Sequence, residues 1–233
     1  MRIKVYQVEN DLDSKGVKFC SYDSALKLAS VIYPSIYECV FDGNIDASNL
    51  EDVFEALNRE HPIGYRGHSL SVSDIVEVLE STDEVDIGCY YCDSIGFKEL
   101  SDFDTSKIEP IKGCRMLVIE PHKAPYEMLI PDNLDALQQA VRGLIECTYP
   151  FVDDNAFVIG NEEAKLIGME GNRRILGEIY AGPILIAADD GYGGTKDLTD
   201  EQIEKYTKMF EQPEDISPDE VTGSIGFTIY GFG

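Results

Sequence analysis

Basic side chains are scarce in this sequence. Its 233 residues hold 19 lysines and arginines against 44 aspartates and glutamates, a formal net charge of −25 at pH 7. Up to residue 110 there are 9 basic and 22 acidic residues, and beyond it 10 and 22, so the two parts carry −13 and −12. Such a surface repels the phosphates of nucleic acids. We expect no direct binding to nucleic acid and, if there is a partner, a protein with a basic surface. The same charge also favours solubility in a crowded cytoplasm, which requires no partner.

Long hydrophobic stretches are lacking as well. The longest apolar run, residues 181–188, is far shorter than the roughly 20 residues that cross a bilayer. Residues 1–4 lead into an alternating strand pattern and not into the apolar core of a secretory signal. The six cysteines are scattered along the chain. We expect a cytoplasmic protein with reduced thiols and no contact with a membrane.

Metal-binding motifs are absent in any complete form. The single CxxC, Cys89 to Cys92, lies in a predicted strand, where residues three apart face opposite sides. Redox-active versions of the motif instead begin a helix, which lowers the pKa of the thiol. No second CxxC is present, and His61 and His68 would complete a zinc site only if long-range folding brought them there. We expect no metal and no other cofactor.

Strand and helix patterns follow one another through the first half and predict a mixed domain over residues 1–108. Apolar residues recur at helical spacing behind Ser48, and Ser48 with Glu51 forms the pattern of a capping box. The expected elements are a strand at 3–8, a helix at 23–31, a strand at 36–41, a helix over 50–57 with Leu50, Val53, Phe54 and Leu57 on one face, and short strands between 65 and 97.

Part of this half resembles a known family. The segments that carry the resemblance are RGHSLSVSDIVEV at 66–78, YYCDSIGFKEL at 90–100, YQV at 6–8 and LEDVFEALNREHP at 50–62. Over about residues 3–103 the chain resembles the YodL-like domain found in proteins of phages and conjugative elements. The resemblance implies an association with mobile elements and no known reaction.

Four polar residues of this stretch form a secondary candidate site: His68, Ser69, Asp74 and Asp93. Their spacing matches no nucleophile elbow, and no third group can be named that would orient His68. Asp74 could equally cap a turn that starts at Ser71. We therefore expect structural roles for these residues, and no catalytic residue among them.

The second half predicts another mixed domain, residues 114–233, after a polar linker at 102–113. The overall prediction is an α+β protein of two small mixed sheet-and-helix domains in tandem. The expected elements are strands at 115–120, 126–130, 145–149, 156–159 and 183–187, a helix capped by Asp132 or Asn133 with Leu134, Leu137, Val141 and Leu144 as its stripe, a mobile glycine-rich loop at 189–196, a helix capped by Thr199 and Gln202 that buries Ile203, Tyr206, Met209 and Phe210, a connector at 211–220 and a C-terminal strand tail at 223–232.

The least generic local chemistry lies between residues 157 and 174. The candidate polar binding site there consists of Asn161, Glu162, Glu163, Lys165, Asn172 and Arg173. Arg173 could reach a carboxylate or a phosphate. The alternative is a hairpin in which the asparagines bond to turn backbone and Arg173 pairs with an acid. The segment offers no His, Ser or Cys nucleophile, which favours the alternative.

This half also resembles a family. The segments concerned are RMLVIEPHKAPYEMLI at 115–130, LQQAVRGLIE at 137–146, YPF at 149–151 and GNEEAKLIGMEGNRRI at 160–175. Over about 115–212 they resemble an uncharacterised domain of phages and conjugative elements, with the signature Asn-Glu-Glu-Gly-Lys-Leu followed by Asn-Arg. Ala164 replaces the usual glycine and would be strained if that position needs a positive φ. The resemblance carries no established activity.

Three functional hypotheses follow. The first is a non-enzymatic acidic interaction protein of a phage or conjugative element, which counters host defence by offering a DNA-binding protein carboxylates in place of phosphates; such a mimic needs rows of carboxylates on one face. The second is an enzyme that handles a nucleotide or small metabolite at the segment from Asn161 to Arg173. The third is an accessory module that helps conjugation or replication machinery assemble through the C-terminal strand.

Overall fold

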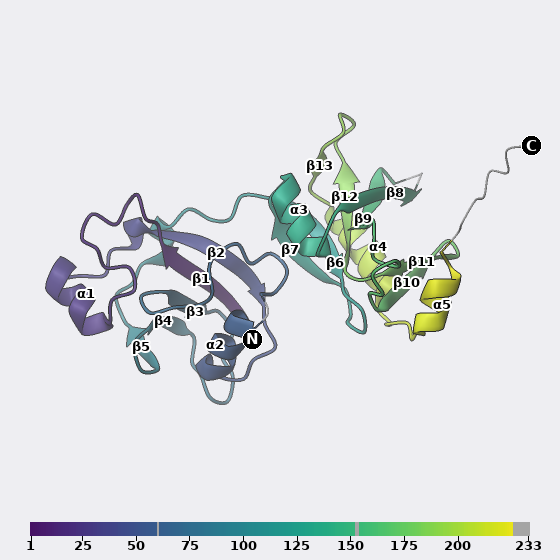
Figure 1. The fold of residues 1–233 in the computed structure, drawn as a ribbon. Helices are drawn as coiled ribbons and strands as arrows, with labels where there is room; N and C mark the ends of the chain where they lie inside the picture. Colours follow the sequence, from purple (N-terminus) through teal and green to yellow (C-terminus); the bar gives the residue numbers. More distant parts are fainter. Residues whose placement is uncertain (60, 152–153, 226–233) are drawn as a thin grey trace, which may run out of the picture. The chain divides into compact units, whose positions relative to one another are not determined.

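The computed structural model describes residues 1–59, 61–151 and 154–225. The chain splits into two compact units, Met1–Ile111 and Lys112–Gly233 (Figure 1). The described residues form five α-helices and three sheets in which every strand pair is antiparallel. The predicted α+β class, with two domains in tandem, is thereby confirmed. No helix in the described ranges is long and apolar enough to cross a membrane.

The first unit is built on a five-stranded sheet in the order β2-β1-β3-β4-β5. Its elements are β1 (Arg2–Val8), α1 (Tyr22–Ala29), the 3-10 helix η1 (Pro34–Ile36), β2 (Tyr37–Asn44), α2 (Leu50–Arg59), β3 (Ile75–Val78), β4 (Gly88–Cys92), β5 (Phe97–Leu100) and the 3-10 helix η2 (Thr105–Lys107). The expected strand at 3–8 and the helices near 23–31 and 50–57 are all present.

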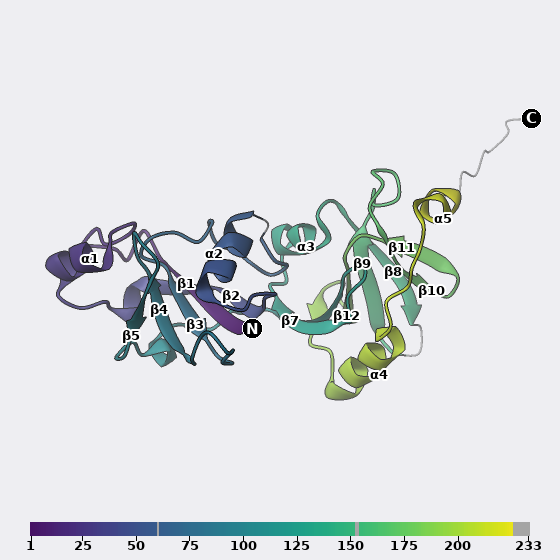
Figure 2. The same cartoon turned by 90° about the horizontal axis from the view of Figure 1, so that it is seen from below.

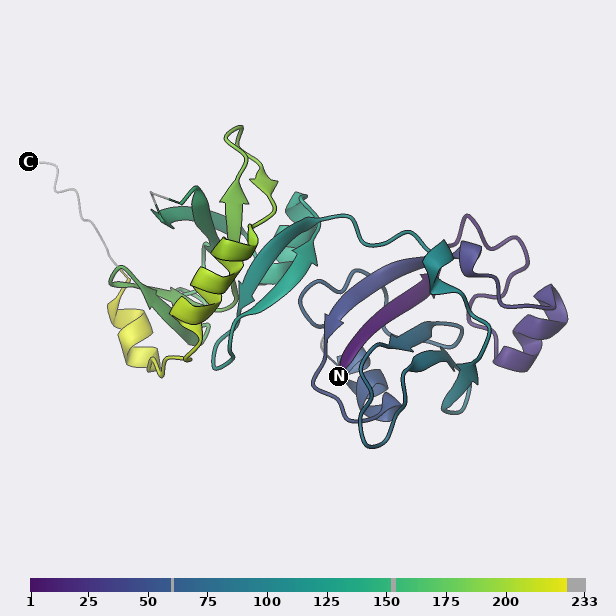
Figure 3. The ribbon, with the colours of Figure 1, turned by 180° about the vertical axis from the view of Figure 1, so that it is seen from behind.

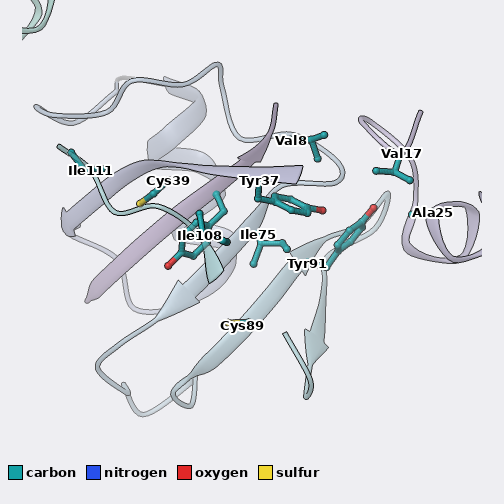
Figure 4. Packing of buried hydrophobic residues seen from close by; sticks show 11 residues of the cluster. Val8, Val17, Ala25, Tyr37, Cys39, Ile75, Cys89, Tyr91, Ile108 and Ile111 are labelled. Atoms are coloured by element: carbon teal, nitrogen blue, oxygen red, sulfur yellow. The ribbon is translucent and has the colours of Figure 1, made fainter. Parts of the chain in front are cut away.

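Both faces of this sheet are buried. The neighbours Ile75 and Val76 point to opposite faces, and each is 0% exposed. On the face shown in Figure 4, Tyr37, Ile75 and Tyr91 gather in one apolar cluster with residues that precede and begin the first helix. The tyrosine hydroxyls in this cluster stay bonded, since Tyr91 donates to the Cys20 carbonyl at 2.7 Å.

The start of α2 differs from the predicted capping box. Asn49 is the capping residue, because its Oδ1 accepts a hydrogen bond from the Asp52 backbone N–H at 2.8 Å. The N–H of Ser48 instead donates to the Asp52 carboxylate at 3.0 Å, so the capping residue lies one position later than predicted. Leu50, Val53 and Leu57 are buried as expected, but Phe54 is 41% exposed and lies off the apolar stripe.

The second unit has a main sheet in the order β7-β6-β12-β9-β8, to which β13 adds on β12, and a separate pair, β10-β11. Its elements are β6 (Cys114–Ile119), β7 (Tyr126–Ile130), α3 (Leu134–Val141), β8 (Ile145–Phe151), β9 (Ala156–Asn161), β10 (Gly171–Ile175), β11 (Glu178–Ala181), β12 (Ile184–Asp189), β13 (Thr195–Lys196), α4 (Asp200–Phe210) and α5 (Pro218–Gly223).

Helices cover the main sheet of this unit from two sides. Figure 2 shows α3 and α4 on opposite faces of the sheet, and Figure 3 shows α4 lying across the strands. Tyr206 and Phe210 pack from α4 onto the sheet residues Ile186 and Val158, all of them buried. Alternate residues of the central strands therefore meet different helices, which explains why β12 is buried throughout its first five residues.

Both helices start where the sequence predicted. Asn133 caps α3, accepting from the Ala136 N–H at 2.9 Å. Thr199 and Gln202 complete a reciprocal capping box at α4. The predicted apolar stripes were partly wrong: three of their members are more than half exposed because they fall beside the buried face or after the helix end, namely Leu134, Leu144 and Met209.

Three other expectations change. The predicted connector at 211–220 contains the start of α5, which Ser217 caps with Glu220. The glycine-rich segment at 189–196 is a β-hairpin and not a loop without structure, since β13 pairs with the end of β12. Residues 226–232 of the predicted C-terminal strand lie outside the described residues, and Gly223 ends α5.

The two candidate caps of α2 can be separated by mutation. Asn49→Ala removes the acceptor of the Asp52 N–H, so we expect the free energy of unfolding to fall by about 1 kcal/mol. Ser48→Ala removes a hydroxyl that makes no capping bond and should change it by less than about 0.5 kcal/mol. Urea unfolding of the full chain measures both. A larger loss for Ser48→Ala than for Asn49→Ala would restore the predicted capping box.

Candidate functional site

The predicted polar site of the second domain does not come together as one site. Asn161, Glu162 and Lys165 line a groove. Glu163 is exposed and contributes its backbone N–H to the Asn161 side chain. Asn172 and Arg173 lie in β10, which pairs with β11 and not with β9, so the predicted hairpin between the two halves of the site is absent.

Asn161 has a structural role at the end of β9. Its Oδ1 accepts from the Glu163 N–H at 2.8 Å, which holds the turn. Its Nδ2 donates to the carbonyls of Val141 at 3.2 Å and Arg142 at 3.0 Å, at the C-terminus of α3. All of its polar atoms are thus engaged. Ala164, which follows, is not among the residues with positive φ and packs in a small apolar cluster, so the feared strain does not arise.

Arg173 is buried, with only 1% of its surface exposed. Its guanidinium donates to the carbonyls of Lys123 at 2.7 Å, Phe210 at 3.1 Å and Asn172 at 2.9 Å. Within the described residues it pairs with no acid, which corrects that expectation, and its donors are committed to buried backbone carbonyls and not to a binding surface. Phe210 ends α4, where carbonyls lack helical partners and the helix dipole favours a positive charge. Burial lowers the pKa of Arg173, although a guanidinium stays charged at neutral pH.

Asn172 completes this buried tie. Its Nδ2 donates to the carbonyls of Ile119 at 2.8 Å and Gly182 at 2.7 Å, and its Oδ1 accepts from Arg173 at 3.1 Å. Together the two side chains connect the ends of β6, α4 and the β11–β12 connection. The Asn-Arg pair is accordingly part of the framework of the domain and not of a binding surface.

The groove that remains has a volume of about 540 Å³. It lies between β8 and β9 on one side and β11 on the other, and the stretch after α5 contributes to it. Its lining comprises Glu146, Thr148, Gly160, Asn161, Glu162, Ala164, Lys165, Leu166, Glu178, Ile179, Tyr180, Ala181, Ile184, Ser224 and Ile225.

Only some of the carboxylates that line the groove have a basic partner. Lys165 forms an ion pair with Glu178. Glu146 and Glu162 form no ion pair within the described residues. Tyr180 and Thr148 share a hydrogen bond of 2.6 Å, and burial raises the pKa of Tyr180, assisted by nearby carboxylates. The groove thus keeps an excess of negative charge.

The secondary candidates of the first domain do come close in part. Asp74 is 0% exposed, and its Oδ2 accepts from the Ser71 N–H at 2.8 Å and from Gln7 Nε2 at 2.9 Å. The Nδ1 of His68 lies 3.9 Å from the same oxygen. The other oxygen of Asp74 has no hydrogen-bond partner. Burial raises the pKa of Asp74 to about 7, although its hydrogen bonds act in the opposite direction.

Gln7 organises this cluster, and the sequence analysis missed it. Its Nε2 donates to the His68 carbonyl at 2.7 Å, and its Oε1 accepts from the His68 N–H at 3.0 Å. A Cβ atom at Gly67 would overlap the Gln7 side chain, which explains the glycine. The only signal in the sequence was a polar residue between apolar neighbours in a strand, and its partners lie about sixty residues away.

Ser69 and Asp93 have other roles. Asp93 accepts from the Tyr22 N–H at 3.1 Å and so holds the start of α1. Ser69 offers its backbone carbonyl to His68 Nδ1 at 2.8 Å. Among the described residues no hydroxyl or thiol bonds to the imidazole of His68, and the Tyr65 hydroxyl donates to its backbone carbonyl at 2.7 Å, so the arrangement lacks an activated nucleophile.

The cysteines of the CxxC are equally unsuited to chemistry. Cys89 and Cys92 are buried in β4, and burial raises their pKa values to about 11 and about 12. Reactive thiols show the opposite shift. In the part of the chain that the structure describes, no His, Cys, Asp or Glu residues are grouped so that they could hold a metal ion.

A dense group of exposed carboxylates lies on the first domain. The N-terminal half of α2 and the segment 79–87 are joined by Thr82 Oγ1, which donates to the Ser48 carbonyl at 2.7 Å, and by Asn49, which donates to Glu84 at 3.0 Å. We call this surface the acidic face; its carboxylates are Asp46, Glu51, Asp52, Glu55, Glu80, Asp83, Glu84 and Asp86, all exposed. The one basic side chain within 44–59 and 79–87 is Arg59, which pairs with Glu55 at 3.0 Å.

Comparison with known families identifies both halves of the chain. The family model of the YodL-like domain matches residues 2–103, and that of a domain of unknown function (DUF3846) matches residues 114–211. The two matches follow the two compact units, which confirms both resemblances. Comparison with curated proteins and with solved structures gave no significant match.

The buried role of Arg173 predicts a contrast with its neighbour. Arg173→Lys leaves several buried carbonyls without a donor, so we expect the free energy of unfolding to fall by roughly 2–4 kcal/mol. Arg174→Lys affects only surface ion pairs with Glu214 and Glu220 and should cost less than about 1 kcal/mol. Urea unfolding of the full chain compares the two. Equal losses would contradict the structural assignment.

Asp74 predicts a pH dependence of stability. Its pKa is raised in the folded state, so the folded chain holds a proton that the unfolded chain has released between about pH 4 and pH 7. This group's contribution is therefore complete below about pH 4 and is lost as the pH rises to about 7, at up to about 1.4 kcal/mol per pH unit. In Asp74→Asn this component should vanish. Parallel stability curves for the two proteins over this range would refute the shift.

Proposed function

We propose that this chain, a YodL-like domain followed by a DUF3846 domain, is a non-enzymatic interaction protein of a phage or conjugative element that binds a basic protein surface. The observation that carries the proposal is the acidic face. Eight exposed carboxylates lie in these two joined segments, which hold a single arginine. Like charges at this density repel one another, and a basic partner relieves the repulsion.

The fold itself uses few of these carboxylates. Asp52 and Glu84 accept local hydrogen bonds, and Glu55 pairs with Arg59. The side chains of Glu51 and Asp83 make no hydrogen bond or ion pair within the described residues. Since stability does not require them, their charge is available to a partner. The absence of an activated nucleophile in either candidate site, judged on the described residues, supports binding over catalysis.

The partner that best fits this charge is a DNA-binding protein of the host. Its groove carries basic side chains placed for phosphates, and carboxylates on a rigid helix and an adjoining segment can occupy them. In this form the protein counters host defence by taking the place of DNA. The interaction then competes with duplex DNA and weakens with salt.

The test combines capture with matched variants. The full chain, immobilised, is expected to retain host DNA-binding proteins from a bacterial lysate at about 50 mM salt and to release them on addition of duplex DNA. The variant E51Q/E80Q/D83N/D86N should retain at least about tenfold less, since four charges are lost from the acidic face.

The control variant E201Q/E204Q/E211Q/D215N removes four exposed carboxylates from the second domain. It should retain the partner as the unaltered chain does. An equal loss of retained partner in both variants would show that the binding depends on the net charge of the chain and not on the acidic face. If the captured proteins stay bound when duplex DNA is added, the proposal that this chain takes the place of DNA is contradicted.

A further inference from the structure

The groove of the second domain combines an apolar floor with a charged rim. Gly160, Ala164 and Ile184 form part of the floor, where the missing side chain of Gly160 leaves space beside Ile184. At the rim, Leu166 is 65% exposed, and Ile167 next to it is 59% exposed. A ligand that fills this groove therefore contacts aliphatic surface in the interior and carboxylates at the edge.

Two carboxylates of the rim, Glu146 and Glu162, line the same groove. Glu146 of β8 pairs in register with Gly160 of β9. Glu162 is the first residue of the turn after β9, and its N–H bonds to the Leu144 carbonyl at 2.9 Å, which holds this turn beside the start of β8. Both glutamates are exposed and line the groove. Neither has a basic partner in the described part of the chain.

One lysine of the chain, Lys165, already lies in this groove. The Lys165 side chain is 22% exposed, so most of its aliphatic stem is covered, while its ammonium pairs at the rim with Glu178, which is 61% exposed. Lysine commonly buries its methylene groups along apolar surface and keeps the charge near water. A second ammonium has the unpaired Glu146 and Glu162 available to it.

We propose that this groove binds a lysine side chain presented by a partner protein, with its stem along Leu166 and Ile179 and its ammonium between Glu146 and Glu162. Two separate carboxylates suit a compact ammonium with three donors better than the planar fork of arginine. Apolar residues that flank the lysine cover Leu166 and Ile167. This inference rests on the proposed function in one respect, namely that the partner is basic. It assigns to that partner a second contact, separate from the acidic face.

The probe is a short peptide with one lysine between two leucines and no other charged group. Titrated into the ¹⁵N-labelled full chain, it should shift the amide signals of Glu146, Gly160 and Glu162 and of β11. A matched peptide with acetyl-lysine, which lacks the charge, should bind at least about tenfold more weakly. The same loss is expected for the chain variant E146Q/E162Q, whereas E201Q/E204Q should bind normally.

A pair of substitutions at Gly160 tests the cavity independently of charge. Gly160→Ala adds a Cβ at an ordinary 3.6 Å from Ile184 and should preserve binding. Gly160→Val fills more of the floor of the groove and should lower the affinity at least about tenfold. Thermal unfolding of each variant shows whether the domain is intact, and E146Q/E162Q provides the test should Gly160→Val fail to fold.

Several outcomes would overturn the proposal. Equal binding of the lysine and acetyl-lysine peptides would show that the ammonium does not contribute to the affinity. If 1,5-diaminopentane binds as tightly as the peptide, the ligand of the groove is a free diamine and not a protein side chain. Shifts confined to the first domain would place the contact elsewhere. The acidic-face variant should bind the peptide normally. Peptide binding without capture of a lysate protein supports the groove and refutes the proposed function. Capture without peptide binding supports the proposed function and refutes the groove.

Discussion

A shortage of cations shapes this molecule. With 19 basic residues for 44 acidic ones, a formal net charge of −25 remains that no cation of the chain neutralises. The cations that exist are used where the fold needs them most. Arg173 is committed to backbone carbonyls in the interior of the second domain, and Arg115 joins Glu127 of β7 to Asp200 at the start of α4. What remains on the surface is an excess of negative charge that the fold itself does not neutralise.

The groups that stabilise the fold are thus different from the groups that are exposed to a partner. The thiols of Cys89 and Cys92 are buried and have raised pKa values, and within the described residues the partly exposed His68 imidazole bonds to no hydroxyl or thiol. The accessible chemistry lies instead in exposed carboxylates, on the acidic face of the YodL-like domain and around the groove of the DUF3846 domain. We propose cationic ligands for both surfaces, for one because of its charge density and for the other because two unpaired glutamates border an apolar floor.

Local patterns predicted the elements well, because capping and amphipathic spacing are decided by residues close in sequence. The caps at Asn133 and Thr199 are examples. The predicted cap at Ser48 was wrong by one residue, since serine and asparagine are adjacent there and both can cap a helix.

The predicted site failed for a different reason. Arg173 was singled out as an unusual cation, but its acceptors belong to residues 123 and 210, and no local pattern shows that they converge. Gln7 and His68 are likewise joined over sixty-one positions. The groove, by contrast, left a signal in the sequence: a glycine inside an apolar strand, Gly160, marks a place where a side chain is missing for a reason.

The central claim is that unpaired carboxylates, and not a reactive side chain, carry the function. Its most direct measurement is the affinity of the purified chain for its isolated partner across a salt series. The account predicts that log Kd rises linearly with log salt, with at least about a tenfold loss of affinity between 50 and 500 mM, because screening weakens contacts between exposed charges. An affinity that does not change over this range would contradict it.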